Sequence, residues 1–557
     1  MKNKYKILLV ISVIALLVGI TSFTFAYLRG TKVQSGTNVI SAVSCLNVSI
    51  VKESNAINLK DAFPITDETA LKSKNPYKFT VRNMCPNFIE AEVNLESLAV
   101  SNQLDKKYIK VYIKSEDMAE PTISILDSLE DRTPILENAT SDSLTSVNIE
   151  PYGEKDFELR LWLDNNTTNE QGMGKYYEGK VVINTVPQPE GILVYGVRRD
   201  INSESSAWER IGASANFVAN AQIGETPVVN DFDSVYPWSH IETYSYNTST
   251  GEEISLSEVG VNNFPFIGTH GQVLTRIPEF YYKRYQQLEE GDKTYEYIFI
   301  SPENLEGFTK SEQFSVGRYT MNNSSDGIYS KSGVLPVVNL VITDFRTNAN
   351  SLGSEFGQLD YRYFILQLLY LVEYADYNSQ SKLGLGHTST LSSGTRISSG
   401  GCDSLGMKSG TLINDGKHSM IYRGIEDIYG NVFQYIDGIN ISNYIAYICT
   451  DPSQYKAISY TGCYEKIGYA NFNISGKYIS KLGYDPNHPL ISLPIASDGS
   501  DSTYVTDRYN ISEENNIAYV GGRWDSGLDA GLWYWALNNN QSTYLNYGIG
   551  GRLLRFN

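Results

Sequence analysis

The residues that most often carry out chemistry are scattered along this chain of 557 residues. None of its histidines belongs to an HExxH motif, and none stands at zinc-site spacing from cysteines. There is no GxSxG motif for a nucleophilic serine and no P-loop for a phosphate. We therefore predict no catalytic residue, no metal site and no cofactor, and we expect structural roles for the five histidines, which are His240, His270, His387, His418 and His488.

The five cysteines allow a different kind of chemistry, the formation of disulfides. Cys449 and Cys463 are close enough in sequence to close one loop, and Cys45 and Cys85 fall in one predicted domain. Disulfides form in exported proteins, so Cys45–Cys85 and Cys449–Cys463 are the possible pairs, with Cys402 left over. Five reduced, buried cysteines are the alternative.

Acidic residues outnumber basic ones, with 63 Asp and Glu against 45 Lys and Arg and a net charge of −18. Binding to nucleic acid depends on an excess of Lys and Arg, so we exclude a nucleic-acid partner. Asp231 and Asp233 in "NDFDSVYPW" could offer oxygen ligands to calcium, but the segment lacks the glycine and the final glutamate of an EF-hand loop. It therefore does not predict a metal site.

The first residues predict export. Lys2, Lys4 and Lys6 precede an uncharged apolar run at residues 7–26, which is long enough to cross a bilayer as a helix. Positive charge before such a run favours a cytoplasmic N-terminus. We predict a signal anchor at residues 1–30, which would hold the protein at the cell membrane or surface in a single pass, with its C-terminal part outside. A cleaved signal peptide and a secreted protein are the alternative.

Residues 31–187 predict a β-sandwich that serves as a stalk. Short runs in this region alternate apolar and polar residues, which is typical of half-buried antiparallel strands. Five such runs are "YKFTVRNMC", "EAEVNLESLAV", "KYIKVYIKS", "DFELRLWLD" and "GKVVINTV". In "VPQPEG" two prolines and a glycine should end the last strand, so we place a linker at residues 188–191.

Residues 192–557 predict a second domain of short strands and long loops with one strong helix. The helical segment is "QLDYRYFILQLLYLVEYAD", residues 358–376, whose apolar stripe should pack against a sheet. The predicted fold class of the whole chain is mostly β with some α, an α+β fold, which begins with an N-terminal transmembrane or signal helix.

Several segments of residues 208–557 resemble a known family. "YRGIEDIYGNVFQYIDGINI" looks like the GNVWEW signature of the sulfatase-modifying-factor branch of the C-type lectin fold. In that branch, the order of the segments is similar to that of the variable proteins of diversity-generating retroelements and of related phage and prophage proteins. The other segments are "DFDSVYPWS", "RIPEFYYK", "LDYRYFILQLLYLVEYADYNSQSKLGLG", "LPIASDGSDSTYVTDRYN" and "VGGRWDSGLDAGLWYWALNNNQSTYLNYGIGGRLL".

The resemblance implies a C-type-lectin-like domain at residues 192–557, whose variable-type face at residues 518–557 binds a ligand. In such families adenine-directed mutagenesis rewrites exposed positions and leaves a frame unchanged. The positions expected to contact ligand are Arg523, Asp525, Leu528, Asp529, Leu532, Tyr534, Ala536, Thr543, Tyr544, Leu545, Tyr547 and Gly548. The expected structural frame is Gly430, Asn431, Trp524, Trp533, Trp535, Gly550 and Arg552, with Arg552 bound to a carboxylate.

The function that these features predict is binding at a cell surface. We expect the C-terminal face to bind a protein or glycan on another cell or phage, because Tyr and Trp give large contact areas at low rotamer cost. The membrane would be contacted through residues 7–26. Two alternatives are a formylglycine-generating-enzyme-like oxidoreductase, although no cysteine follows Cys463, and a prophage tail or receptor-binding protein, against which the apolar N-terminal run argues.

Overall fold

The computed structural model describes most of the chain in two compact units, Met1–Ile192 and Leu193–Asn557. The residues it describes are 30–33, 48–51, 58–60, 62–72, 76–83, 89–115, 123–150, 153–187, 194–255, 271–288, 293–305, 307–324, 327–389, 395–539 and 545–556. The apolar run 7–26, the predicted linker 188–191 and the possible pair Cys45–Cys85 lie outside the described residues.

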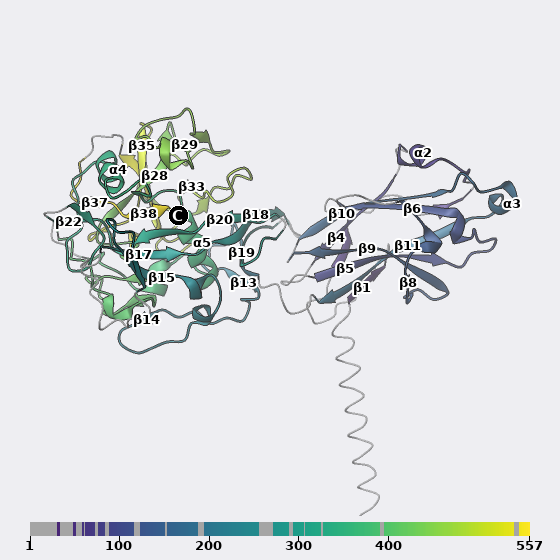
Figure 1. Cartoon of the computed structure of the whole chain (residues 1–557), viewed down its shortest axis with the longest axis horizontal. Helices are drawn as coiled ribbons and strands as arrows, with labels where there is room; N and C mark the ends of the chain where they lie inside the picture. Colours follow the sequence, from purple (N-terminus) through teal and green to yellow (C-terminus); the bar gives the residue numbers. More distant parts are fainter. Residues whose placement is uncertain are drawn as a thin grey trace, which may run out of the picture. The chain divides into compact units, whose positions relative to one another are not determined.

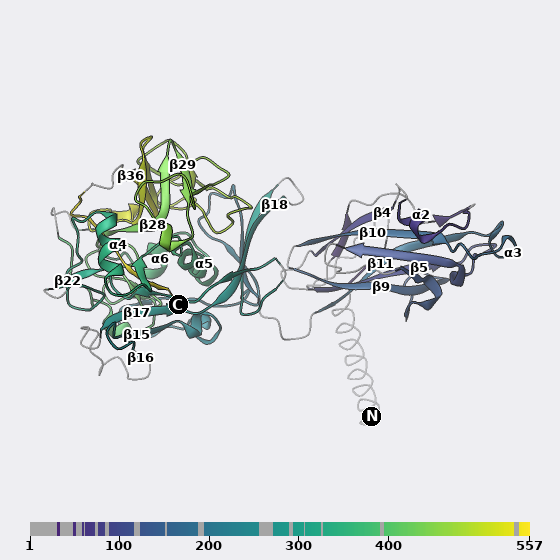
Figure 2. The ribbon, with the colours of Figure 1, turned by 45° about the horizontal axis from the view of Figure 1, so that its top comes forward.

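The described residues of the first unit form two sheets with antiparallel neighbours, seen as two layers in Figures 1 and 2. One sheet has the order β1 (Gly30–Val33), β11 (Tyr177–Pro187), β5 (Ile89–Leu98), β9 (Ala139–Ile149) and β8 (Asp131–Arg132), with β3 (Asn58–Leu59) on β11. The other has the order β2 (Val48–Val51), β4 (Tyr77–Asn83), β10 (Glu154–Leu163), β6 (Ile109–Ser115) and β7 (Ile123–Ile125). Short helices α2 (Asp67–Leu71) and α3 (Asn169–Gly172) lie between strands.

Alternating side chains of both sheets form one core in this unit. Phe79 and Val81 of β4 are buried together with Val93 and Leu95 of β5. Such alternation is the pattern from which the strands were predicted. The strand β9 was missed because its sequence, "ATSDSLTSVNI", is mostly polar.

The described residues of the second unit form six sheets. The largest has the order β30 (Glu465–Lys466), β29 (Ile445–Ile448), β28 (Phe433–Ser442), β35 (Asn516–Gly521), β36 (Gly531–Asn539), β34 (Arg508–Ile511) and β31 (Lys477–Tyr478), with β37 (Ile549–Gly550) on β28. A six-stranded sheet has the order β16 (Glu253–Ser255), β15 (Glu242–Tyr246), β17 (Gln272–Ile277), β21 (Phe314–Gly317), β38 (Leu553–Phe556) and β24 (Phe356–Gln358).

The described part of this unit also contains four smaller sheets. A five-stranded sheet has the order β13 (Glu209–Gly212), β12 (Tyr195–Asp200), β19 (Thr294–Ser301), β18 (Phe280–Leu288) and β20 (Thr309–Ser311). A four-stranded sheet has the order β14 (Gln222–Ile223), β25 (Gly410–Thr411), β26 (Ile421–Tyr422) and β27 (Ile425–Glu426). Two strand pairs are β22 (Asn322–Ser324) with β23 (Gly327–Tyr329) and β32 (Lys481–Leu482) with β33 (Pro494–Ala496).

Three α-helices belong to the described part of the second unit, α4 (Ile342–Asn350), α5 (Tyr363–Tyr374) and α6 (Ser379–Leu383). The helix predicted at residues 358–376 is α5, and every one of its side chains is buried. The helix therefore has no solvent-exposed face, whereas we expected one apolar stripe that packs against a sheet. The helix is shorter than predicted because Gln358 belongs to β24 and Ala375 adopts the left-handed conformation, with φ of 51°.

The predicted fold class was wrong. We expected a mostly β protein with some α, an α+β fold that begins with a transmembrane or signal helix, whereas the structure is a β-rich fold of multiple sheets, with 42% strand and 13% helix. In the part of the chain described by the structure, no helix is both long and apolar enough to span a membrane. The helical content is low because even the most helical segment yields a helix of only 12 residues.

Candidate binding face

The tryptophans expected in the frame are buried in the second unit. Trp533 and Trp535 point from β36 toward α5 and its C-terminal end. The ring of Trp535 stacks on Phe364 at a centroid distance of 5.1 Å, and Trp533 meets the edge of Tyr377 at 5.0 Å. Trp524 is buried in the loop that follows β35. These contacts attach the C-terminal strands to the central helix.

Three residues of one strand, β36, that were expected to contact ligand are buried instead. Leu532, Tyr534 and Ala536 lie on β36 and are 0%, 8% and 1% exposed. Because β36 lies between β35 and β34, with side chains packed over both of its faces, residues on either face are covered. The ring of Tyr534 packs edge-on against Phe433, and its hydroxyl accepts a hydrogen bond from Asn510 Nδ2 at 2.8 Å. These three positions do not form part of a surface.

Other expected positions are exposed or, in the case of Arg523, half-buried, and they form what we call the candidate face, made of Arg523, Asp525, Leu528, Leu545 and Tyr547. Leu528 and Leu545 are each 55% exposed, and Tyr547 is 70% exposed. Arg523 Nε and Nη2 donate to the two carboxylate oxygens of Asp525 at 2.7 and 3.1 Å. The face therefore combines three exposed apolar side chains with one paired cation and anion.

Gly548 brings the two loops of the candidate face together. A Cβ atom at this position would lie 2.6 Å from both Cδ and Nη1 of Arg523, so the arginine side chain passes directly over the glycine. The loop at residues 523–529 consequently contacts the loop at residues 545–548. Gly548 is buried beneath that side chain, and Thr543 and Tyr544 lie outside the described residues.

Asp529, also expected to contact ligand, is already held by neighbours. The hydroxyl of Tyr478 donates to its Oδ1 at 2.6 Å, and Arg508 Nη1 donates to its Oδ2 at 2.5 Å. These bonds fix the base of the loop that carries Leu528. We assign Asp529 to positioning of the candidate face.

The frame turn at Gly430 and Asn431 positions the loops around the face. Both residues have positive φ, 78° and 59°, which suits glycine and asparagine. The side chain of Asn431 accepts from the N–H of Ile397 at 3.0 Å and donates to its carbonyl at 3.1 Å. The N–H of Trp524 donates to the carbonyl of Asn431 at 3.3 Å. One turn thus connects the loop at 397 with the loop of the candidate face.

Arg552 is buried, but the carboxylate partner that we predicted for it was wrong. Its guanidinium donates to Oε1 of Gln434 and to the main-chain carbonyls of Gly317, Arg318, Glu426 and Asp427, all at 2.7 to 3.0 Å. Burial lowers the pKa of Arg552 to about 10, so it stays charged at neutral pH. Gly550, the frame glycine of β37, leaves no free room for a side chain, because a Cβ atom would lie 3.1 Å from the carbonyl oxygen of Val337.

A pair of buried carboxyl groups under this region was missed by the sequence reasoning. Glu426 accepts from the N–H groups of Gly400 and Cys402 at 2.6 and 2.8 Å, and Asp427 accepts from Asn431 Nδ2 at 2.9 Å. Burial, together with the neighbouring carboxyl of Asp427, raises the pKa of Glu426 to about 8. Burial also raises the pKa of Asp427. The only signal in the sequence was an acidic pair inside an apolar run.

Cys449 and Cys463 form a disulfide with a Cα–Cα distance of 5.1 Å, and Cys402 is buried and free. Cys449 has no exposed surface. The oxidoreductase alternative needs a cysteine pair that opens into a pocket, and neither cysteine lines any of the three cavities described next.

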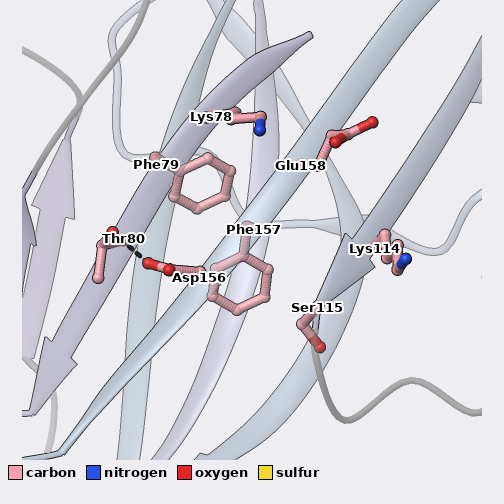
Figure 3. A pocket seen from close by; sticks show the side chains of 8 residues that line it. All are labelled: Lys78, Phe79, Thr80, Lys114, Ser115, Asp156, Phe157 and Glu158. Carbon is pink, nitrogen blue, oxygen red and sulfur yellow. Dashed lines mark hydrogen bonds between the residues drawn. The ribbon is translucent and has the colours of Figure 1, made fainter.

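Three of the cavities in the described residues are large enough to consider here. Figure 3 shows one of 430 Å³ in the first unit, where the rings of Phe79 and Phe157 stack at 4.9 Å and Thr80 donates to Asp156. The second unit has one of 380 Å³ beside α5 and one of 670 Å³ lined by residues between 233 and 242 with Arg276, Lys408 and Arg423. No residue of the candidate face lines any of them.

The two aspartates considered for calcium have other partners. Asp231 Oδ2 accepts from the N–H of Val218 at 2.7 Å, and Asp233 forms an ion pair with Arg423 at 2.6 Å. Within the part of the chain that the structure describes, no group of three or more His, Cys, Asp or Glu residues could hold a metal ion.

Comparison with known proteins adds no family assignment. No protein-family model matches the chain, and no curated protein is significantly similar to it.

Proposed function

We propose that this protein is exported, is displayed at a cell surface and binds a protein or glycan ligand through the candidate face. The observation that carries this function is the exposure of Leu528, Leu545 and Tyr547 beside the Arg523–Asp525 pair. Apolar side chains that gather on a surface mark interaction sites, and tyrosine and arginine are enriched among the residues that dominate binding energy.

The buried frame supports binding by a preformed surface. Trp524 is buried beside Arg523, and Asp529 is fixed by Tyr478 and Arg508. A surface whose loops are already ordered loses less conformational entropy when it binds. We therefore expect little rearrangement of residues 523–529 on ligand binding.

Export is part of the same proposal. It rests on the apolar residues 7–26, which lie outside the described residues, and on the Cys449–Cys463 disulfide, because disulfides persist in oxidising compartments. Fractionation of cells tests it. Recovery of the full-length chain from membrane or wall material is expected, and recovery only from phage particles would favour the prophage tail alternative.

Diversification of the face by a retroelement rests on the resemblance alone and can be read from the DNA that flanks the gene. A near-copy of the 3′ end should differ from the gene mainly where the copy has adenine. The burial of Leu532, Tyr534 and Ala536 makes this expectation sharper, since the differences should concentrate in the codons of the candidate face. Without such a copy, the protein would be a receptor of fixed sequence.

To test the binding function, beads that carry the full chain are incubated with arrays of extracellular proteins and glycans. A variant with Leu528→Ser, Leu545→Ser and Tyr547→Ser should lose at least about tenfold in affinity for whatever the native chain binds, since loss of each anchor costs on the order of 1 kcal/mol. Val229→Ser is the matched control, because Val229 is an exposed apolar residue of the second unit outside the face. Equal binding by the triple variant would contradict the proposal.

A further inference from the structure

The cavity of 380 Å³ in the second unit has the size of a small-molecule site. Its walls come from β18, β20, the first turn of α5, the end of β29 and the loop at residues 487–491. Much of its lining is apolar and consists of Phe314, Ile365, Ile448, Leu490 and Ile491. Such a lining favours a ligand with an apolar body.

Arg362 is one of the charged residues that line this cavity, together with Lys310 and Glu312. Its Nη1 donates to Oδ2 of Asp360 at 2.5 Å, and its side chain is 18% exposed. Among the described residues, neither Nε nor Nη2 of Arg362 has a hydrogen-bond partner. These two atoms form the side of a guanidinium that binds the two oxygens of one carboxylate in parallel.

Neighbouring groups hold the guanidinium in place. Asp360 is fully buried and also accepts hydrogen bonds from the main-chain N–H of Arg362 at 3.0 Å and from the hydroxyl of Tyr455 at 2.8 Å. The guanidinium lies 5.0 Å from the ring centroid of Tyr361 and 5.1 Å from that of Phe556. A cation fixed in this way loses little freedom when it binds an anion.

Two tyrosine hydroxyls line the same cavity. Tyr282 comes from β18 and Tyr361 precedes α5, and neither hydroxyl has a hydrogen-bond partner among the residues of the described ranges. Burial raises the pKa of both hydroxyls, so both remain hydrogen-bond donors at neutral pH. Lys310, another cation of the lining, is already paired with Glu279 and Glu312.

We propose that this cavity binds a small molecule that carries a carboxylate on an apolar body, with the carboxylate on Nε and Nη2 of Arg362. The hydroxyls of Tyr282 and Tyr361 donate further hydrogen bonds, and the aliphatic wall covers the apolar part. This site is separate from the proposed function, because no residue of the candidate face lines the cavity. Either site can therefore fail its test without affecting the other.

Benzoate is a suitable probe for the full chain, with ligand-observed NMR and isothermal titration calorimetry as measurements. We expect benzoate to bind with millimolar affinity, while benzyl alcohol, which lacks the carboxylate, and acetate, which lacks the apolar body, bind at least about tenfold more weakly. Absence of benzoate binding, or equal binding of benzyl alcohol, would overturn the proposal.

Two variants assign the binding to this cavity. Arg362→Lys keeps the charge but removes the two parallel donors, and we expect about tenfold weaker benzoate binding. Tyr361→Phe leaves the Asp360–Arg362 pair intact and should weaken binding about threefold by removing one hydrogen bond. Tyr281→Phe is the matched control, since Tyr281 lies on β18 but does not line the cavity. The proposed site is wrong if both Tyr361→Phe and Arg362→Lys bind benzoate as tightly as the native chain does. For Tyr361→Phe, this comparison requires an unchanged melting temperature.

Discussion

The carboxyl groups of Glu426 and Asp427 lie in the interior next to the turn of Asn431, which positions the loops around the candidate face. A carboxyl buried beside another carboxyl resists ionisation, because its charge is costly in a medium of low polarity. The contribution of this pair to the free energy of unfolding therefore depends on pH. The pair also contacts Asn431, whose turn supports the candidate face.

We expect the free energy of unfolding to fall as the pH rises from about 4.5 to about 8. The pKa of Glu426 is about 8 in the folded protein and has an ordinary value of 4.5, so over this range the folded state binds more protons than the unfolded state. The stabilisation that Glu426 contributes is fully present below the unfolded pKa of 4.5 and is lost as the pH approaches the folded pKa of about 8. Over this range the free energy of unfolding should fall by about 1 kcal/mol per pH unit.

Urea unfolding at several pH values measures this slope. Glu426→Gln should reduce the pH dependence of the free energy of unfolding. Asp525→Asn changes an exposed carboxylate and should leave this pH dependence as it is. A native-like slope in Glu426→Gln would show that another group titrates.

The residue types in the sequence predicted part of the candidate face and its frame. The other features depend on contacts between segments that are far apart in the sequence. The aromatic and glycine-rich tail indicated buried tryptophans and exposed positions such as Tyr547, which the structure shows. The sequence could not show that Arg552 meets main-chain carbonyls, because these carbonyls belong to segments more than 100 residues away. It also could not show that Asp360 and Tyr455 meet.

At the scale of elements, β36 decides which tail residues can contact a ligand. Its two faces are both covered, so alternation along the strand does not produce an exposed row. The exposed positions instead come from the loops at either end of it. A sequence with period two predicts a strand, but it does not reveal whether one face or both are buried.

Substitution of two tyrosines tests the placement of β36. Tyr534→Ser should destabilise the protein by about 3 kcal/mol, because it removes a buried ring that packs on Phe433. Tyr547→Ser should change the free energy of unfolding by less than about 0.5 kcal/mol, because that ring is exposed. Thermal or urea unfolding distinguishes the two. Similar effects of both changes would mean that β36 is not covered on this face.

The disulfide closes the loop that carries Tyr455 onto Asp360. Cys449 and Cys463 are separated by 14 residues in sequence, and a loop of this size predicts a stabilisation of about 3 kcal/mol. Replacement of both cysteines by serine should therefore lower the melting temperature. Reductant should lower that of the native chain to the same value and leave the double variant unaffected. A native chain insensitive to reductant, with cysteines shown to be reduced, would contradict this expectation.

At the scale of the whole molecule, each unit has a hydrophobic core of its own. Phe79 belongs to the core of the first unit and Trp535 to that of the second. The composition of the chain predicted abundant strand, but the α+β class was wrong, because the most helical segment yields a helix of only 12 residues in a β-rich structure. The fractions of helix and strand depend on many short strands and loops, and these segments have no strong sequence pattern from which they could be predicted.

Separate cores should unfold as separate transitions in calorimetry. Phe79→Ala should lower the transition of the first unit, by an amount that corresponds to about 4 kcal/mol, and leave the other transition in place. Trp535→Ala should do the reverse. A single transition that both changes lower would show that the two units unfold together.

The arginine that passes over Gly548 has a consequence for how this tail can evolve. Any side chain introduced at 548 would push aside Arg523, and with it the partner of Asp525. Codons 523 and 548 are therefore coupled in their effect, although they lie 25 positions apart. A mutation of codon 548 moves the charged group that codon 523 encodes, so selection acts on the two codons together.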